Sequence, residues 1–257
     1  MKIALTFDVE RDIPNFLDTD FGIKIGLIKI LKLLEEHQIK ATFFCAGNVA
    51  KQLRWVVPLI ETKEHEIACH SLNHERLNKL SFEECKQSIS NNKKLIENEC
   101  RNSKIIGFRA PYLKPPRFIY RLLNDLGFKY DSSISSHKKS ESYYLKDYNI
   151  QEFHPFNLYF LFRLPIGFSF IKKWVFKKEL SILYFHSWEA IDIKRLILNQ
   201  SNKFNLFKDY FFRIDRWVNT GDLFIKRLRN FIKEALSKKV EFVTLRDLMI
   251  YKERTLT

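Results

Sequence analysis

The chain has 257 residues, of which 46% are hydrophobic, and its 44 Lys and Arg against 30 Asp and Glu give a formal net charge of +14. Such a length suits one large domain or two small ones. No uninterrupted apolar run reaches about 18 residues, which excludes a membrane-spanning helix. The basic excess indicates an anionic partner, which could be nucleic acid, membrane phosphate or an acidic substrate, or else a solvated basic surface.

Cysteine usage and the N-terminus bear on the compartment. The four cysteines show no CxxC spacing, and a chain of this length needs no covalent staples, so we expect reduced thiols. Met1 and Lys2 lead directly into an apolar strand, without the apolar region and cleavage site of a signal peptide. Together these features predict a cytoplasmic protein.

The first predicted strand, residues 2–7, runs into two carboxylates. Successive side chains of a strand point to opposite faces, so Asp8 and Glu10 can look into one cavity while Val9 packs behind them. Buried carboxylates are costly unless they are paired or bound to a metal. They are therefore candidates for a metal ligand and a general base, although a strand that ends in solvated acids would give the same pattern.

Helical and strand patterns then alternate along the chain. Asp20 is the expected cap of a helix at 21–37, and Ser81 with Glu84 forms a capping box that opens a long helix to about residue 99. The other expected elements are strands at 40–45, just before His70, at 104–108, ending at 130–133 and beginning near 183, with helices at 49–61 and 113–128. This alternation predicts a parallel sheet with helical crossovers, either a barrel or an open sheet. Active residues of such folds cluster at the carboxyl ends of the strands.

Two histidines, His70 and His74, lie four residues apart just after a short apolar strand. On a helical turn this spacing places both rings on one side, where they can reach one point. Neutral imidazoles are ligands for zinc and similar divalent ions. The spacing is common, however, and two surface residues in a loop between a strand and a helix would also fit it.

Two further strand ends carry residues with a chemical use. Arg109 follows the strand at 104–108, where a guanidinium can clamp a carboxylate and hold it ionised. Pro111 fixes the backbone of the next turn, which can aim an N–H group into the site. His186 lies at the exit of the buried strand that begins near residue 183 and is a candidate general acid.

The order of these segments resembles that of the polysaccharide deacetylases, the NodB-homology group of carbohydrate esterase family 4. Thr6-Phe7-Asp8-Val9-Glu10 is similar to the first family motif, and His70-Ser71-Leu72-Asn73-His74 to the second. Arg109-Ala110-Pro111-Tyr112 is similar to the third motif, and the strand that ends in His186 to the fifth. Residues 240–245 look like the family's last strand, so the resemblance covers nearly the whole chain.

The resemblance implies a distorted (β/α) barrel of about seven parallel strands, formed by one catalytic domain over residues 1–257. It also implies one divalent ion, zinc or else cobalt, manganese or nickel, held by His70, His74 and an acidic residue of the first motif. The family's adjacent aspartate pair is here Asp8-Val9-Glu10, so Glu10 would be the metal carboxylate. The sequence alone leaves the roles of Asp8 and Glu10 interchangeable.

The same resemblance implies the catalytic roles. Asp8 would be the general base, oriented by Arg109, and His186 would be the general acid. The family orients this histidine through an acidic residue of a fourth motif, which is poorly matched here, and Asp131 is the candidate for it. Three residues are candidates for binding the substrate and its oxyanion: Tyr112, Pro111 and Trp188.

A basic segment rich in aromatic residues, at about residues 137–220, is expected to be an insertion or a cover of the barrel. Aromatic residues share one predicted helical face at 204–218 with Lys and Arg elsewhere, as in segments that lie at a membrane interface, although the same residues could complete the core. Thr220 is the expected cap of a last helix with an inward apolar face. Because the basic residues are spread over several elements without a nucleic-acid motif, no nucleic-acid partner is expected.

These features predict a hydrolase that removes the N-acetyl group from an N-acetylhexosamine. The basic aromatic surface favours a sugar on a polyprenyl phosphate or similar lipid at the inner face of the membrane, as in assembly of lipid A, O-antigen or capsule. A deformylase or another C–N hydrolase on the same barrel is the alternative among enzymes. A catalytically inactive module that binds carbohydrate or a membrane surface is the alternative from another class. The oligomeric state is left open.

Overall fold

The computed structural model describes residues 1–13, 17, 19–135, 142–156, 159–199 and 214–249. Most of the helix predicted at 204–218, and parts of the basic segment at about 137–220, lie outside these residues. Among the described residues, no helix is both long enough and apolar enough to cross a membrane.

The strands form one curved sheet centred on β1 (Lys2–Val9). β1 pairs in parallel with β2 (Thr42–Cys45) on one side and β8 (Leu180–His186) on the other, and the short β9 (Glu241–Phe242) pairs with its first residues. Beyond β2 the sheet continues through β3 (Glu66–Cys69), β4 (Gly107–Phe108), β5 (Tyr130–Asp131), β7 (Ile150–Phe153) and β6 (Ser142–Leu145). Of these strands β6 pairs antiparallel with its neighbour.

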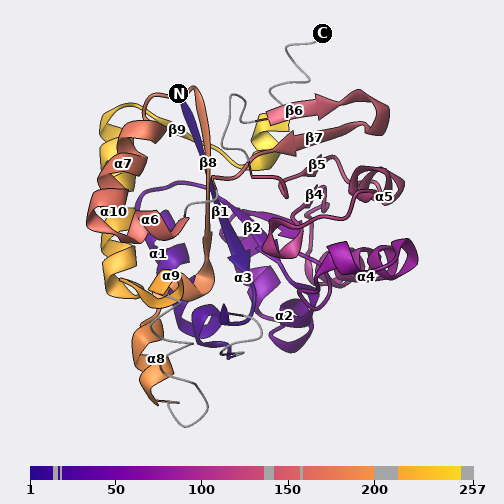
Figure 1. Cartoon of the computed structure of the whole chain (residues 1–257), viewed down its shortest axis with the longest axis horizontal. Helices are drawn as coiled ribbons and strands as arrows, with labels where there is room; N and C mark the ends of the chain where they lie inside the picture. The colour runs from indigo at the N-terminus through magenta and orange to yellow at the C-terminus, as the bar shows by residue number, and fades with distance from the viewer. Residues whose placement is uncertain (14–16, 18, 136–141, 157–158, 200–213, 250–257) are drawn as a thin grey trace.

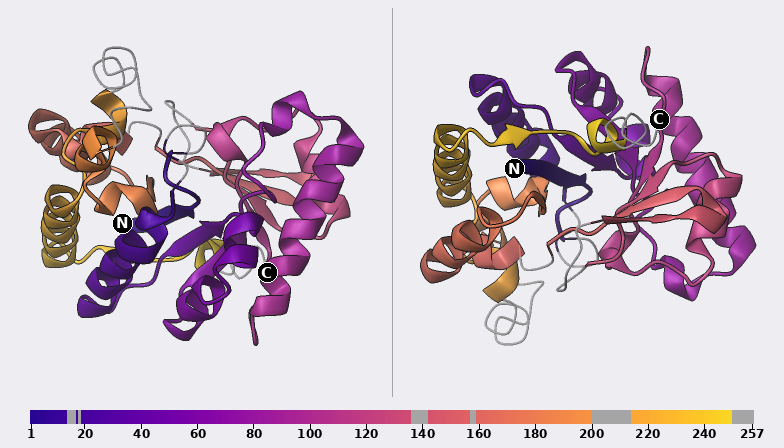
Figure 2. Two further views of the ribbon diagram at one scale, coloured as in Figure 1. Left: turned by 90° about the horizontal axis from the view of Figure 1, so that it is seen from below. Right: turned by 90° about the horizontal axis from the view of Figure 1, so that it is seen from above.

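The sheet curls until its two ends approach each other just beyond β7. Phe156 donates its N–H to the carbonyl of Ile182 in β8 at 2.9 Å and forms a parallel bridge with Leu183. The helices lie around the outside of the sheet (Figures 1 and 2). The predicted distorted (β/α) barrel is therefore confirmed, and the described residues supply eight parallel strands, counting the two-residue β9, where about seven were expected.

Ten labelled α-helices occur in the described residues, with α4 on one flank of the barrel and α7 and α10 on the opposite flank (Figure 1), and residues 245–249 are helical as well. They are α1 (Ile28–Glu36), α2 (Gly47–Gln52), α3 (Val56–Thr62), α4 (Phe82–Glu99), α5 (Ile119–Asp125), α6 (Tyr159–Arg163), α7 (Pro165–Val175), α8 (Ile193–Asn199), α9 (Ile214–Trp217) and α10 (Asp222–Ser237). A π-helical turn precedes α1 (Gly22–Leu27), and shorter 3₁₀ turns occur at Leu77–Lys79, Pro111–Leu113, Lys146–Tyr148 and Ser187–Ala190.

The capping box at the start of α4 is confirmed. Ser81 Oγ accepts the N–H of Glu84 at 3.3 Å, and the Glu84 carboxylate accepts the N–H of Ser81 at 2.8 Å. The side-chain cap expected from Asp20 is wrong, because the helical segment begins after Phe21 and the Asp20 carboxylate accepts from Arg11 Nε at 3.3 Å. The carboxylate of Asp12, ten residues earlier, instead accepts the N–H of Gly22 at 2.7 Å.

Three other expected helices differ in their limits. The helix at 49–61 is divided into α2 and α3 by an irregular residue at Leu53, and the helix at 113–128 shortens to α5 because two consecutive prolines precede it. Thr220 does not cap the last helix. α10 begins after Gly221, whose φ of 76° suits glycine, and the Thr220 hydroxyl accepts the N–H of Ile193.

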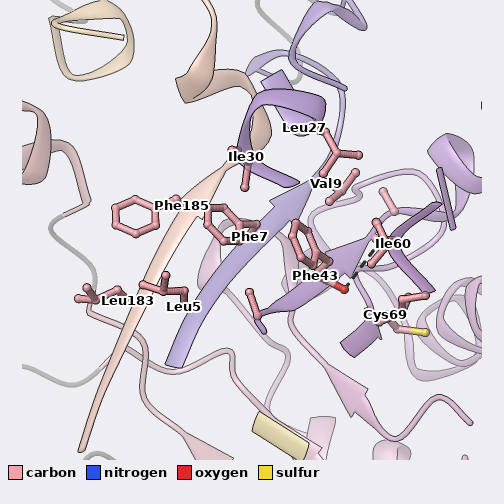
Figure 3. Close-up of a cluster of buried hydrophobic side chains, with 14 of the residues drawn as sticks. Leu5, Phe7, Val9, Leu27, Ile30, Phe43, Ile60, Cys69, Leu183 and Phe185 are labelled. Carbon is pink, nitrogen blue, oxygen red and sulfur yellow. Dashed lines mark hydrogen bonds between the residues drawn. The ribbon is translucent and has the colours of Figure 1, made fainter. Parts of the chain in front are cut away.

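Alternation along β1 separates two layers of the core. Leu5, Phe7 and Val9 point outward beneath α1 (Figure 3), and Phe7 stacks on Phe43 of β2 with ring centroids 5.2 Å apart. The opposite face of β1 looks into the barrel. An apolar cluster fills part of the barrel interior, and it includes Ala4, Phe44, Ala68, Tyr130, Phe153 and Ile182. This packed base leaves the carboxyl ends of the strands as the place where polar side chains can meet.

Candidate active site

The site lies where the carboxyl ends of β1 and β3 come together. The parallel register pairs Val9 with Cys45 and Cys45 with Cys69, so β1, β2 and β3 end level with one another. Glu10 and His70 are the next residues of β1 and β3, and both are buried. The predicted convergence of the first two motifs at one end of the barrel follows directly from this register.

Glu10, His70 and His74 form a compact group of possible metal ligands. One ligand atom from each lies within 4.8 Å of the others, with His74 Nε2 at 2.5 Å and His70 Nε2 at 3.4 Å from Glu10 Oε2. Burial alone would raise the pKa of Glu10, but the charges and hydrogen bonds of His74 and His70, with His186, hold that pKa well below its usual value. The carboxylate is therefore in the ionised form that a metal requires.

The orientation of His70 also fits a metal. Its Nδ1 lies 2.8 Å from the carbonyl oxygen of Arg109, which can only accept, so Nδ1 carries the proton and Nε2 presents a lone pair. Nε2 is buried and makes no hydrogen bond within the described residues. Two imidazole nitrogens and one carboxylate are a donor set suited to zinc and similar divalent ions.

The two histidines do not lie on a helical turn, contrary to the sequence expectation. Residues 70–76 form a loop in which Ser71 and His74 have φ of 60° and 59°. The start of α2 holds this loop, because the N–H groups of Gly47 and Asn48 donate to the carbonyls of Ser71 and Leu72 at 3.0 and 2.7 Å. The rings converge through this irregular backbone, with centroids 5.2 Å apart.

Asp8 is held beside the metal-ligand group by Arg109, the contact that the family resemblance implies. The guanidinium is fully buried over the ring of Phe44, and its Nη1 donates to Asp8 Oδ1 at 2.7 Å. Nη2 donates to the hydroxyls of Thr6 and Ser132, and Nε to the Ser132 carbonyl, each at 3.0 Å. The other oxygen of Asp8 lies 3.6 Å from His70 Nε2, so it faces the metal-ligand group.

The third motif lies against His74. Pro111 opens a tight turn in which Tyr112 has a φ of 61°, and the Tyr112 ring meets the His74 ring edge-on at 4.6 Å. The guanidinium of Arg76 lies 4.4 Å above the Tyr112 ring. The turn therefore forms a wall of the site on the side of the second motif.

His186, the last residue of β8, and Trp188, in the 3₁₀ turn that follows, face the metal-ligand group. The two rings stack with centroids 4.6 Å apart, Trp188 Nε1 donates to Glu10 Oε1 at 3.3 Å, and His186 Nε2 lies 4.0 Å from the same oxygen. Burial tends to lower the pKa of His186, but the hydrogen bond with Glu189 and the charges of Glu10, Glu189 and Asp8 raise it overall. The His186 ring therefore faces the metal-ligand group across a short gap.

The carboxylate at His186 Nδ1 belongs to Glu189, at 3.2 Å, whereas the sequence favoured Asp131. Asp131 accepts the N–H of Ser132 and the hydroxyl of Ser133 and lies beside Glu152 of β7. Glu189 could have been recognised as an acid three residues after a strand-end histidine. Its own partner, Arg163, carries no such signal, because it lies in an aromatic segment far away in sequence.

Comparison with known proteins identifies the class. The family model described as polysaccharide deacetylase matches residues 1–130, which is half of the chain and includes the first three motifs. The chain therefore belongs to the polysaccharide deacetylase family.

Individual relatives agree with this assignment. The chain is 30% identical over 100 residues to a chitooligosaccharide deacetylase of Azorhizobium caulinodans. This match covers 39% of this chain and 48% of that protein. It is 29% identical over 115 residues to a peptidoglycan-N-acetylglucosamine deacetylase of Bacillus cereus. That match covers 45% of this chain and 36% of the relative. The chain thus spans about half or less of the length of these relatives.

A solved structure matches the whole chain. It comes from Mycobacterium smegmatis, is assigned to the polysaccharide deacetylases, and superposes with a TM-score of 0.74 over 100% of this chain and 91% of that one. The identity is 18%, so this likeness supports the fold alone.

Proposed function

We propose that the protein is a metal-dependent hydrolase that removes the N-acetyl group from an N-acetylhexosamine. The observation that carries this proposal is the convergence of Glu10, His70 and His74 on one point, with Asp8 and His186 beside them. Membership of the polysaccharide deacetylase family gives the reaction class, and the two relatives above are named for deacetylation of N-acetylated sugars.

Glu10, His70 and His74 would hold the ion, for which we propose zinc, with cobalt, manganese or nickel as possible substitutes. Such an ion, when bound, makes water acidic enough to attack at neutral pH and polarises a carbonyl oxygen. Asp8, fixed by Arg109, takes a proton from the attacking water. His186 gives a proton to the amide nitrogen as the C–N bond breaks, which leaves acetate and a free amino sugar. The turn at Pro111 and Tyr112 and the Trp188 ring would bind the sugar and its oxyanion.

Acetate release from N-acetylated sugars linked to a polymer, a nucleotide or a lipid tests the proposal. We expect His70→Ala and Asp8→Asn to abolish release, and a chelator to do so reversibly. His37→Ala, which removes a partly exposed imidazole at the end of α1, is the matched control and should remain active. Formate release from N-formyl sugars without acetate release would favour the deformylase. Full activity of either site variant would refute the assignment.

We further propose that the sugar is carried on a polyprenyl phosphate or similar lipid and is met at an anionic membrane surface. Helix α7 supports this. Its exposed face begins with Ile166 and Phe170, which are 87% and 56% exposed, and continues with exposed Lys173, and exposed Lys177 follows just after the helix. The opposite face packs on α10, where Phe176 stacks on Phe231. Exposed apolar side chains next to lysines are typical of helices that lie at a membrane interface.

Flotation with vesicles tests the membrane contact. The wild-type protein should float with vesicles of phosphatidylglycerol and phosphatidylcholine and much less with phosphatidylcholine alone. Ile166→Ser with Phe170→Ser should abolish flotation. Phe21→Ser with Ile25→Ser removes a similarly spaced apolar pair, 42% and 46% exposed, and should leave flotation intact. Equal flotation of the two double variants would exclude α7 as the contact.

A further inference from the structure

Glu189 is a fully buried carboxylate that contacts both the backbone and the ring of His186. Its Oε1 accepts the backbone N–H of His186 at 3.0 Å and lies 3.2 Å from Nδ1 of the ring. An ionised carboxylate only accepts hydrogen bonds, so Nδ1 must carry a proton. Nε2 is then the ring nitrogen that faces Glu10 Oε1, at 4.0 Å. Stacking on Trp188 fixes the plane of the same ring.

The second oxygen of Glu189 is held by Arg163, the last residue of α6. Arg163 is fully buried, and its Nε lies 2.9 Å from Glu189 Oε2. Its two Nη groups donate to the carbonyls of Val218, at 2.8 Å, and Asp215. Arg163 thus pairs with Glu189 as an ion pair, while its two Nη groups fix the guanidinium to the carbonyls of Val218 and Asp215.

A buried ion pair of this kind does little for stability, because desolvation offsets the attraction between the charges. Apolar residues of similar size would serve the packing as well or better. The pair supplies a negative charge, on the Glu189 carboxylate, at a fixed position next to His186 Nδ1. Asp131, the residue favoured by the sequence, is engaged by Ser132 and Ser133 on a different strand.

We propose that Glu189, held by Arg163, is the positioning residue of the proton donor. It fixes His186 with Nδ1 protonated and Nε2 directed at the leaving nitrogen, a task that falls to a local glutamate of the 3₁₀ turn after β8. The inference rests on the proposed function. In the step concerned, His186 is an imidazolium whose Nδ1–H stays on Glu189. The C–N bond breaks, its electron pair stays on nitrogen, and the Nε2 proton moves to that nitrogen, which leaves a neutral ring protonated on Nδ1. The proton that Asp8 takes from water balances the one that His186 loses.

The test replaces Arg163 and Glu189 together, so that neither is left as an unpaired buried charge. Arg163→Met with Glu189→Met removes both charges at similar volume and should fold. Amide hydrolysis should fall by about 10²-fold, whereas hydrolysis of 4-nitrophenyl acetate, whose leaving group needs no proton, should fall by less than about tenfold. Arg163→Met with Glu189→Gln keeps an oxygen that can accept from Nδ1–H, and should recover most of the loss.

Two comparisons separate positioning from a structural role. His186→Ala should show the same preference for the ester, and adding the methionine pair to it should change the amide-to-ester ratio no further. If the methionine pair lost activity equally on the amide and on the ester, so that the amide-to-ester ratio stayed as in the wild type, the proposal would be overturned.

A measurement that needs no turnover distinguishes failure of this inference from failure of the proposed function. In protein labelled with ¹⁵N-histidine, the His186 ring, assigned by its absence in His186→Ala, should show a protonated Nδ1 in the wild type. The methionine pair should lose this preference. A wild-type ring with Nδ1 unprotonated would overturn the inference even in an active enzyme, and the expected pattern would uphold it even if no acetylated sugar were hydrolysed.

Discussion

At the scale of single residues, Arg109 fixes the orientation of the Asp8 carboxylate. The guanidinium satisfies the carboxylate, two hydroxyls and one backbone carbonyl at once, and it lies over Phe44. A planar fork of donors can do this, whereas the compact ammonium of lysine cannot. The arrangement leaves one oxygen of Asp8 directed at the metal-ligand group. Arg109 therefore links the packed interior of the barrel to its chemistry.

Arg109→Lys should lower kcat for acetate release by about 10²-fold and the free energy of unfolding by about 3 kcal/mol, because the buried Asp8 charge loses part of its compensation. Zinc content should be unchanged, since none of the ligand atoms belongs to the Arg109 side chain. Turnover, urea denaturation and metal analysis measure the three effects. Arg117→Lys, at an exposed site, is the control. Wild-type turnover in Arg109→Lys would remove Asp8 orientation from the mechanism.

Asp131 and Glu152 form a second buried acidic pair, opposite each other on β5 and β7. Burial raises the pKa of Asp131 to about 6, and burial with the Asp131 charge raises the pKa of Glu152 well above its usual value. Both groups hold protons more tightly in the folded chain than in the unfolded one. Their contribution to stability is therefore full below about pH 4 and is lost as the pH rises through about 6 and beyond.

Glu152→Gln should make the free energy of unfolding fall less steeply between pH 5 and pH 8, because one of the two raised pKa values disappears. The glutamine oxygen can still accept the N–H of Ile134, which Glu152 Oε1 accepts at 3.0 Å, and its amide can donate to Asp131. Chemical denaturation across this pH range measures the slope. Glu83→Gln, on the exposed side of α4, should leave the slope as in the wild type. Identical slopes in all three proteins would contradict the assignment.

At the scale of elements, local patterns predicted the alternation of strands and helices and one of the three expected helix caps, whereas contacts between distant segments could not be predicted from them. The placement of Asp8 and Glu10 on one side of the chain and the capping box at Ser81 depend on neighbours in the chain. Both carboxylates lie within 4 Å of His70 Nε2, and the capping box is confirmed. The backbone of the His70 loop and the partner of His186 depend on residues brought together by folding. Arg163 illustrates the limit, since nothing near it in sequence marks its contact with Glu189.

Helix α4 offers a test of such a local signal. Ser81→Ala removes the acceptor for the N–H of Glu84 and should lower the free energy of unfolding by about 1 kcal/mol. Ser90→Ala removes a hydroxyl that bonds only within the same helix, to the Gln87 carbonyl, and should have a much smaller effect. Urea denaturation of both variants measures the difference. Equal stabilities would show that neighbouring packing, and not the cap, holds the start of α4.

At the scale of the whole molecule, the metal-ligand group ties together segments that β2 separates in the sheet. Glu10 extends β1, and His70 and His74 extend β3, so an ion held by all three would brace that end of the barrel against opening. The unfolded chain has no preformed site, and binding free energy then adds to folding free energy.

Saturating zinc should therefore raise the free energy of unfolding, by about 2.7 kcal/mol at a free concentration 100 times Kd, and a chelator should reverse the change. His74→Ala should lose nearly all of this increment, because two ligands from β1 and β3 hold zinc far less tightly than three. His37→Ala also lacks one imidazole but should keep the full increment, which controls for zinc bound to the unfolded chain. An increment of the same size in His74→Ala would mean that zinc binds elsewhere, and the brace between β1 and β3 would have to be abandoned.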